Sequence, residues 1–423
     1  MAFQRRMNWP LVAAAALTLA CAGCSDDDPA GTGASGSSGS SGSGGAGDCL
    51  QTLSPTGDDQ EAVQTALIEI ANGGTICFAA GTFQFNRELS LSQDSVVLRG
   101  AGLDETIFDF SGQTSGANGL TITGDVVTVE KLTVKNTPGD GVRATDVKDI
   151  TFREVAVRWD AAASTANGAY GLYPVGSDSV RIEKCVVNGA RDAGIYVGQS
   201  THILVAESEA YGNVAGIEIE NSTDAEVRDN DAHDNTAGIL VFNLPNLPVQ
   251  DGKRAKVHGN VIKQNNLENF AEEGTVVSKV PAGCGVVLLA SDDNEFHDNQ
   301  IEGNISLGIA VLHYAPILFG AFDDPEFDPY AQGNWVHDNV FADNGTDPGS
   351  LVGGLTTERP IPDVMDDGCQ DPNVTPSPET ANCLVDDGGT YLDFDIPGPE
   401  CAMDSTDPSE VTCEHESLPS QDP

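Results

Sequence analysis

The chain has 423 residues, of which 65 are acidic and 20 are basic, giving a formal net charge of −45. A surface this negative repels nucleic acid and anionic membrane surfaces, which excludes nucleic acid as a partner. Ten cysteines favour a protein that folds in an oxidising compartment.

The chain begins with the pattern of a bacterial secretion signal. Two arginines precede an apolar run over residues 11–20, which is too short to span a membrane. The next segment, Ala22-Gly23-Cys24, resembles a lipobox in which Cys24 is lipidated, with Cys21 as a rival site and a plain secretory signal as the alternative. The sequence thus predicts a lipoprotein signal over residues 1–23 and a lipid-anchored protein of the bacterial cell envelope, facing the periplasm or the cell surface.

A flexible tether follows the signal. Residues 31–47 consist almost entirely of Gly and Ser, a composition that behaves as a random coil. We therefore expect residues 24–48 to tether the folded domain to the lipid.

A helix is predicted directly after the tether. In residues 58–74, Val63, Leu67, Ile68 and Ile70 recur at helical spacing, and two glycines end the pattern. Such a helix would cover the open end of a repeat fold, which needs a cap.

The centre of the chain repeats. Segments GLYPVGS, GIYVGQS, GIEIENS and GILVFN start at residues 171, 194, 216 and 238, so the period is 22 or 23 residues. Apolar residues alternate after each glycine, as in strands. Two or three short strands in 22 residues leave no room for a helix, which predicts an all-β fold, a parallel β-helix, over residues 49–345.

Asparagine recurs at matching positions of this pattern. Asn230, Asn260, Asn299 and Asn339 each end a similar tetrapeptide. In stacked coils their amides would hydrogen-bond from rung to rung, whereas ordinary turn asparagine is the alternative.

One strand column offers a candidate binding face. If Leu172, Ile195 and Ile217 point inward, then Tyr173, Tyr196 and Glu218 point outward in register. Tyrosine rings stack on sugar rings and carboxylates bind hydroxyls, so the strip predicts a polysaccharide-binding face, flanked by long insertions. The candidate binding residues are Tyr170, Tyr173, Arg191, Asp192, Tyr196, Glu218 and Tyr314.

Catalysis is the alternative function for the same face. Glycoside hydrolysis needs two carboxylates on either side of a bond, and the weak candidates are Glu218, Glu220 and His313. A structural salt bridge for Arg191 with Asp192, and a loop anchor for His313 with Tyr314, are the competing interpretations.

Metal binding receives little support from the sequence. Acidic turns at 229–235 and 291–299 offer oxygen ligands that suit calcium, but neither matches a calcium-loop spacing. We expect solvated acidic surface there, with calcium as the alternative and no other cofactor implied.

The tail, residues 346–423, is rich in Pro and Asp and short of apolar residues. Disulfides are the expected staples in such a segment, although sequence cannot choose the pairing. The candidate cysteines are Cys49 and Cys77 near the start of the domain and Cys369, Cys383, Cys401 and Cys413 in the tail.

The phrases at 168–175, 192–200, 214–222 and 238–248 resemble a family of bacterial right-handed parallel β-helix repeat lipoproteins. Its repeats are similar to those of carbohydrate-binding proteins and sugar hydrolases. The resemblance covers residues 55–345 and implies a right-handed fold and an envelope location, without fixing a reaction.

A second resemblance is partial. Residues 170–175 keep the frame of the mannuronan epimerase motif, but Tyr173 replaces its acid and Val175 its histidine. That activity is therefore not expected. Two hypotheses remain, namely a tethered module that binds polysaccharide or an envelope protein, and a polysaccharide lyase or glycoside hydrolase. A buried carboxylate pair or histidine beside Tyr196 would favour the enzyme, and a flat open strip would favour binding.

Overall fold

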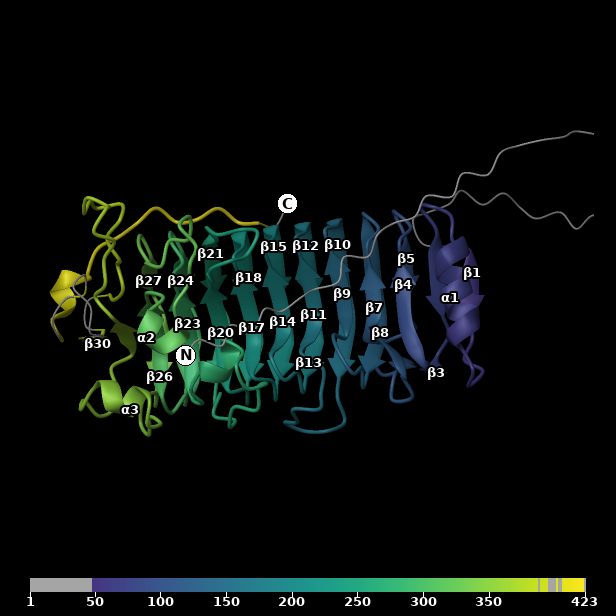
Figure 1. Cartoon of the computed structure of the whole chain (residues 1–423), viewed down its shortest axis with the longest axis horizontal. Coiled ribbons are helices and arrows are strands. Elements are labelled where there is room, and N and C mark those ends of the chain that lie inside the picture. Colours follow the sequence, from purple (N-terminus) through teal and green to yellow (C-terminus); the bar gives the residue numbers. More distant parts are fainter. Residues whose placement is uncertain (1–47, 387–388, 395–400, 402–404, 422–423) are drawn as a thin grey trace, which may run out of the picture. The chain divides into compact units, whose positions relative to one another are not determined.

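The computed structural model describes residues 48–386, 389–394, 401 and 405–421 (Figure 1). The predicted signal, Cys24 and nearly all of the tether lie outside the described residues. Among the residues described, no helix is long and apolar enough to cross a membrane.

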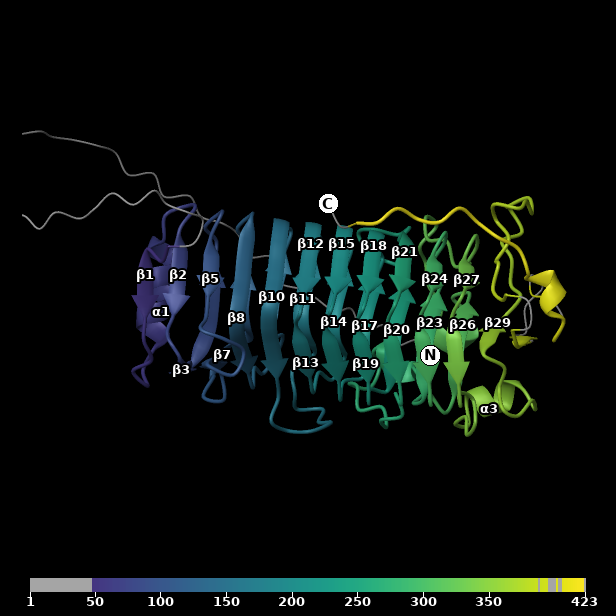
Figure 2. The same cartoon turned by 180° about the vertical axis from the view of Figure 1, so that it is seen from behind.

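The described residues form a parallel β-helix, as predicted. Strands of successive rungs pair in parallel and lie side by side along the stack (Figures 1 and 2). Each regular rung contributes three strands, one to each of three parallel ladders. One rung, for example, consists of β14 (Ala193–Gly198), β15 (Thr201–Ala206) and β16 (Glu209–Tyr211).

The first strand of each rung belongs to an 11-stranded sheet. Its strands are β4 (Arg87–Leu91), β7 (Ser115–Ile122), β9 (Val142–Thr145), β11 (Tyr170–Val175), β14 (Ala193–Gly198), β17 (Ala215–Glu220), β20 (Ala237–Phe242), β23 (Cys284–Leu289), β26 (Leu307–Leu312), β29 (Val364–Asp366) and β30 (Tyr391–Asp393).

The other strands form a 19-stranded sheet made of two ladders that share the long strands β8 (Val127–Lys135) and β10 (Lys148–Arg158). The first ladder adds β1 (Gln51–Leu53), β2 (Thr75–Phe78), β5 (Val97–Arg99), β12 (Asp178–Glu183), β15 (Thr201–Ala206), β18 (Thr223–Arg228), β21 (Lys253–His258), β24 (Glu295–His297) and β27 (Trp335–His337). The second ladder adds β3 (Gly81–Gln84), β6 (Thr106–Asp109), β13 (Val186–Asn188), β16 (Glu209–Tyr211), β19 (Asp231–His233), β22 (Val261–Lys263), β25 (Gln300–Glu302) and β28 (Val340–Ala342).

Apolar residues fill the interior of the coil. Leu172, Ile195 and Ile217 are fully buried and stand opposite one another on successive rungs. Alternate residues of the strands therefore point inward, as the period-two pattern predicts.

The predicted helix caps the first rung. It is α1 (Gln60–Glu69), and Val63 and Leu67 pack into the hydrophobic core, whereas Ile68 is 60% exposed. Ile68 follows Leu67 by one position, a rotation of about 100°, which turns its side chain away from the core.

The tail closes the other end. Leu384 and Val411 belong to the same hydrophobic core, and β29 and β30 pair in register after β26. The 11-stranded sheet thus continues into the segment assigned to the tail. The remaining helices are short, η1 (Val277–Lys279), α2 (Pro316–Phe319), α3 (Val352–Leu355) and η2 (Pro408–Glu410).

The predicted asparagine ladder is present. Asn230, Asn260 and Asn299 each donate a side-chain N–H to the amide oxygen of the next asparagine, ending at Asn339, over 2.9 Å. A second ladder joins Asn213, Asn235, Asn265, Asn304 and Asn344, and a third joins Asn294, Asn334 and Asn382.

The six candidate cysteines form three disulfides. The pairs are Cys49–Cys77, Cys369–Cys401 and Cys383–Cys413. Cys185 and Cys284 are free and buried.

Candidate functional site

The outward columns of the 11-stranded sheet carry the candidate site. Tyr173 stands opposite Arg143 of the preceding rung, and Tyr196 stands opposite Glu218 of the following one. The register predicted for Tyr173, Tyr196 and Glu218 is therefore present, and Glu220 lies two residues further along the same face.

Three tyrosine rings pack together on this face. The ring of Tyr170 stacks on that of Tyr173 with centroids 4.4 Å apart, and Tyr196 lies 4.7 Å from Tyr170 and 4.8 Å from Tyr173. Arg143 lies over the Tyr173 ring, 4.8 Å from its centroid, a cation–π arrangement. Tyr170 and Tyr173 remain partly exposed, whereas Tyr196 is 4% exposed.

Carboxyl groups lie beside two of these tyrosines. The Tyr196 hydroxyl donates a hydrogen bond to Glu220 Oε1 over 2.6 Å, and Gln199 Nε2 donates to the same oxygen over 3.2 Å. Asp192 lies near Tyr170, and its charge contributes to raising the pKa of the Tyr170 hydroxyl, after burial. We call Tyr170, Tyr173, Tyr196, Asp192, Glu218 and Glu220 the tyrosine–carboxyl cluster.

Burial raises the pKa values of the carboxyl groups in the cluster. It raises the pKa of Glu220 to about 7, although the hydrogen bonds from Tyr196 and Gln199 oppose it. Burial and the Glu220 charge raise the pKa of Asp192 to about 7. Since these carboxyls share one site, they exchange protons near neutral pH.

Glu218 is the most perturbed acid of the group. Burial, together with the charges of Asp192 and Glu220, raises its pKa well above the ordinary value. Its side chain is 3% exposed, and Oε2 is buried without a hydrogen-bond partner among the described residues. A buried carboxyl oxygen without a hydrogen-bond partner lowers the stability of the fold, and a proton or a bound ligand would relieve that cost.

The cluster is not an open strip, contrary to the exposed face that the strand pattern suggests. Tyr196 belongs to a hydrophobic cluster that includes Val277 and Val280, with Phe270 packed against it. These residues belong to the insertion at 267–284, which joins the same hydrophobic cluster on the outward face. A residue's outward orientation on its strand thus does not make it exposed, because other parts of the chain pack on the same face.

Two further residues join the site without having been predicted. Asp140 and Arg143 lie one rung before Tyr173, with Arg143 Nη1 3.5 Å from Asp140 Oδ2. Burial raises the pKa of Asp140 to about 6 although Arg143 lowers it. A constant repeat length would have placed Arg143 in register with Tyr173 and Tyr196. The insertion at 159–170 breaks the repeat between the rung of Arg143 and the rung of Tyr173, which hid this register.

Arg191 contacts the insertion at 267–284. It forms an ion pair with Glu272, and its Nε donates to the Asn167 carbonyl over 2.9 Å. Its ion-pair partner is Glu272 and not Asp192, although the Arg191 charge lowers the pKa of Asp192 against the effect of burial.

His313 and Tyr314 lie away from the cluster, four rungs beyond Tyr196. Tyr314 is buried among Phe319, Phe322 and Phe327, as a loop anchor would be. His313 Nδ1 lies 2.8 Å from Asp367 Oδ2.

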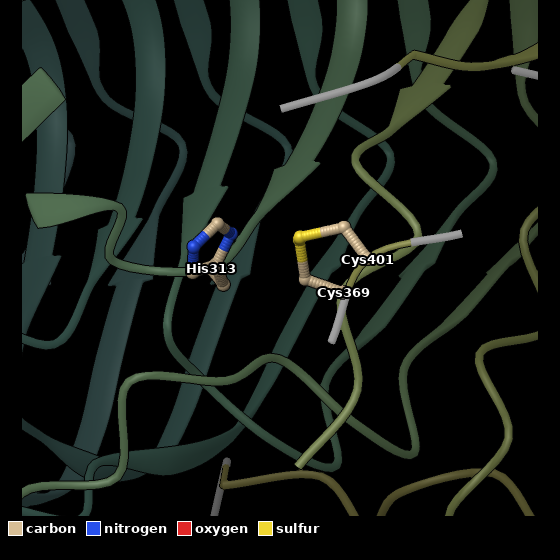
Figure 3. A group of neighbouring side chains, drawn as sticks. All are labelled: His313, Cys369 and Cys401. Carbon is tan, nitrogen blue, oxygen red and sulfur yellow. A yellow bond between two sulfur atoms is a disulfide. The ribbon is translucent and has the colours of Figure 1, made fainter. Parts of the chain in front are cut away.

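His313 also faces two sulfur atoms. Its ring and the sulfurs of Cys369 and Cys401 lie within 4.8 Å of one another, but the sulfurs are joined in a disulfide (Figure 3). In this state neither cysteine offers a thiolate, which is the form that binds metal.

The acidic turns considered for calcium use their side chains internally. Asn230, Asn235, Asn294 and Asn299 belong to the ladders, and Asp231 pairs with Lys263 over 2.9 Å. These contacts give calcium binding at the turns no support.

The outward face turns apolar beyond the cluster. A cavity of about 400 Å³ is lined by Phe242, Val287, Leu312 and other apolar residues, and Ile317 at its wall is 74% exposed. No member of the tyrosine–carboxyl cluster lines this cavity.

The sequence model for the right handed beta helix region matches residues 118–266 and 165–323. Together with the strand pairing, this match identifies the chain as a right-handed parallel β-helix protein. No curated protein matches the sequence.

Two solved structures share the fold. The A-module of mannuronan C-5 epimerase AlgE6 from Azotobacter vinelandii is 19% identical, with a TM-score of 0.52 over 73% of this chain and 76% of that one. The A-module of AlgE4 from the same organism is 16% identical, with a TM-score of 0.50 over 82% and 96%. At this identity the likeness concerns the fold alone.

Proposed function

We propose that this protein is a polysaccharide-cleaving enzyme of the bacterial cell envelope, with the tyrosine–carboxyl cluster as its site. The observation that carries the proposal is the buried carboxyl pair, Glu218 and Glu220, beside Tyr196. Sugar binding alone requires aromatic rings and hydrogen-bonding groups. Acids held near neutral pKa are needed for proton transfer.

The cluster suits a neutral glycan. The partly exposed rings of Tyr170 and Tyr173 offer a stacking surface for the apolar face of a sugar. Three neighbouring carboxyls and a net charge of −45 disfavour an anionic polymer. The epimerase reaction is not proposed, because Tyr173 and Val175 replace the acid and histidine of its motif.

Hydrolysis assigns different roles to the two glutamates. Glu218, whose pKa burial and the neighbouring charges raise well above its usual value, would donate a proton to the glycosidic oxygen as general acid. Glu220, whose ionised form accepts the Tyr196 hydroxyl, would take a proton from the attacking water as general base. Water thus adds across the bond, and the two carboxyls exchange protonation states.

The envelope location rests on the sequence. The predicted signal over residues 1–23, the lipidation residue Cys24 and the Gly/Ser tether support a lipid-anchored protein. Three disulfides are consistent with an oxidising compartment.

A binding module without catalysis is the second candidate. It is favoured by one observation, that Tyr196 and Glu218 are almost fully covered while Tyr170 and Tyr173, which form the rim, are partly exposed. Such a module would hold polysaccharide, or an envelope partner, on the rim alone.

Incubation of the purified protein with neutral and uronate polysaccharides separates these functions. New reducing ends, lost in Glu218→Gln and Glu220→Gln by about 100-fold or more, would support hydrolysis, and unsaturated ends would indicate a lyase instead. The control is Glu302→Gln, an exposed glutamate on β25 of the other sheet.

Retention of polysaccharide without products would refute the enzyme. If Tyr173→Ala then weakens retention, the binding module is supported. If neither products nor retention occur with any polymer, polysaccharide cleavage and polysaccharide binding both fail at this face, and an envelope protein is the remaining partner.

A further inference from the structure

The C-terminal segment, residues 414–421, lies along the rungs of the first ladder. Figures 1 and 2 show it in yellow, running back from the tail end across the strands. It begins directly after Cys413, whose disulfide to Cys383 fixes its start. The segment has no part in the tyrosine–carboxyl cluster, which lies on the other sheet.

Two glutamates of the ladder receive this segment. Glu295 Oε2 accepts the Leu418 backbone N–H over 2.7 Å and the Ser417 hydroxyl over 3.1 Å. Glu226 Oε2 accepts the Gln421 backbone N–H and the Ser420 hydroxyl, each over 2.7 Å. The same Ser–amide pair is thus used twice, three residues apart.

A lysine between the glutamates holds the segment from the middle rung. Lys256 Nζ donates to the Leu418 carbonyl over 2.8 Å and to the Ser417 hydroxyl over 3.0 Å. Lys256 stands opposite Glu226 on one side and Glu295 on the other. We call these three residues the Glu226–Lys256–Glu295 row.

The spacing of the row matches that of an extended peptide. Glu226 and Glu295 lie two rungs apart, or roughly 9.6 Å at about 4.8 Å per rung. Three residues of a polyproline II chain span roughly 9.3 Å at 3.1 Å each. Pro419, between the two pairs, favours that conformation and lacks the N–H that would be left without an acceptor.

Both glutamates are covered when the segment is in place. Glu226 is 3% exposed and Glu295 is 2% exposed. Their Oε1 atoms are engaged by histidines, with His258 Nε2 2.9 Å from Glu226 and His337 Nε2 3.3 Å from Glu295. The Oε2 atoms accept hydrogen bonds from the peptide, and Glu295 Oε2 also lies 3.5 Å from Lys256 Nζ. Burial acts to raise the pKa of Glu226, yet the hydrogen bonds from Ser420, His258 and Gln421 outweigh it and the pKa is lowered.

We propose that the Glu226–Lys256–Glu295 row is a binding site for an extended peptide with two Ser–amide pairs three residues apart, and that the chain's own segment 414–421 is its ligand. Recognition depends on the three-residue period, which the rung spacing imposes. The segment therefore fastens the disulfide-bonded tail to the row by specific contacts. A separate peptide with the same spacing binds the row when the chain's own segment is displaced from it.

Changing the period in the full chain tests the proposal. One Gly inserted between Pro419 and Ser420 leaves every residue of the row intact but moves Ser420 and Gln421 off Glu226. Amide hydrogen exchange of the segment after residue 419 should become at least tenfold faster. One Gly added after Pro423 is the matched control and should change nothing.

A peptide in trans gives the second measurement. A labelled peptide with the sequence of residues 414–423 should bind the full-length insertion variant more tightly than it binds the unaltered chain. In the variant Glu226 is released, so that the peptide has to displace only the variant's own Ser417 and Leu418 from Glu295 and Lys256. The same peptide carrying the extra Gly should bind the variant at least tenfold more weakly than the native spacing does.

Two results would overturn the proposal. Unchanged exchange in the insertion variant would mean that the disulfide and general packing hold the segment. Equal affinity for the two peptides would mean that binding to the row does not depend on the three-residue spacing of the Ser–amide pairs. Thermal unfolding of the insertion variant, expected to match that of the control, checks that the domain remains folded.

Discussion

Glu218 is a buried acid that its surroundings leave without a counter-charge. No cation pairs with it among the described residues, and its nearest charged neighbours, Asp192 and Glu220, raise its pKa. In the folded protein the neutral form is therefore favoured. At high pH the ionised carboxylate lowers the free energy of unfolding. Groups that destabilise the fold in this way are common at functional sites.

Replacing this carboxyl by an amide of the same shape should stabilise the protein. We expect Glu218→Gln to raise the free energy of unfolding by roughly 1–3 kcal/mol at about pH 8, because no charge is then buried. The gain should shrink as the pH falls toward about 5, because a raised pKa leaves less of the Glu218 carboxyl ionised there. Urea unfolding of this variant and of Glu302→Gln measures the difference. Destabilisation of equal size at both pH values would show that Glu218 is an ordinary structural residue.

The sequence predicted the cluster only in part. Tyr173, Tyr196, Glu218 and Glu220 share one face because strand periodicity and a constant repeat length determine their register. Their burial could not be predicted, because it depends on tertiary contacts with other parts of the chain. Asp140 and Arg143 were not predicted, because an insertion separates their rung from the regular repeats.

At the scale of the elements, the asparagine ladders hold the turns between strands. Asn260 is fully buried; it accepts the N–H and an amide hydrogen of Asn230 and donates to the Val227 carbonyl and to Asn299. Asn339, at the end of the same ladder, is only partly buried. One type of residue thus occupies an interior and a terminal position of one ladder.

We predict that Asn260→Ala destabilises the protein more than Asn339→Ala does. The interior change leaves buried backbone groups unpaired, at a cost of roughly 2–4 kcal/mol, whereas water can replace the terminal amide at about 1 kcal/mol or less. Thermal unfolding of both variants checks the order. Equal losses would mean that the ladder contributes no more than ordinary turn asparagine.

The sequence predicted elements best where the spacing was uniform. The central rungs, the helix α1 and the ladder ending at Asn339 follow from periodicity alone. The tail does not repeat, so neither the strands β29 and β30 nor the choice among three pairings of its four cysteines could be predicted. The ladders through Asn235 and Asn334 were missed because the tetrapeptide around them varies.

At the scale of the whole molecule, the raised acids make stability depend on pH. Burial raises the pKa of Asp140 to about 6 and of Asp192 and Glu220 to about 7, against about 4 in an unfolded chain. The folded state therefore binds protons more tightly than the unfolded state between these values. Stability from these groups is complete below about pH 4 and is lost as the pH rises toward about 7.

Self-repulsion of a chain with a net charge of −45 acts in the same direction, and salt separates the two effects. Repulsion between exposed charges is screened at about 1 M salt, whereas the cost of ionising a buried acid is not. We expect the free energy of unfolding to fall by roughly 3 kcal/mol or more between about pH 5 and pH 8, with much of the fall persisting at high salt. Urea unfolding at both pH values, at low and high salt, measures it. Loss of the pH dependence in high salt would assign it to surface charge, whereas its persistence in the wild type and reduction in Glu218→Gln would assign it to the tyrosine–carboxyl cluster.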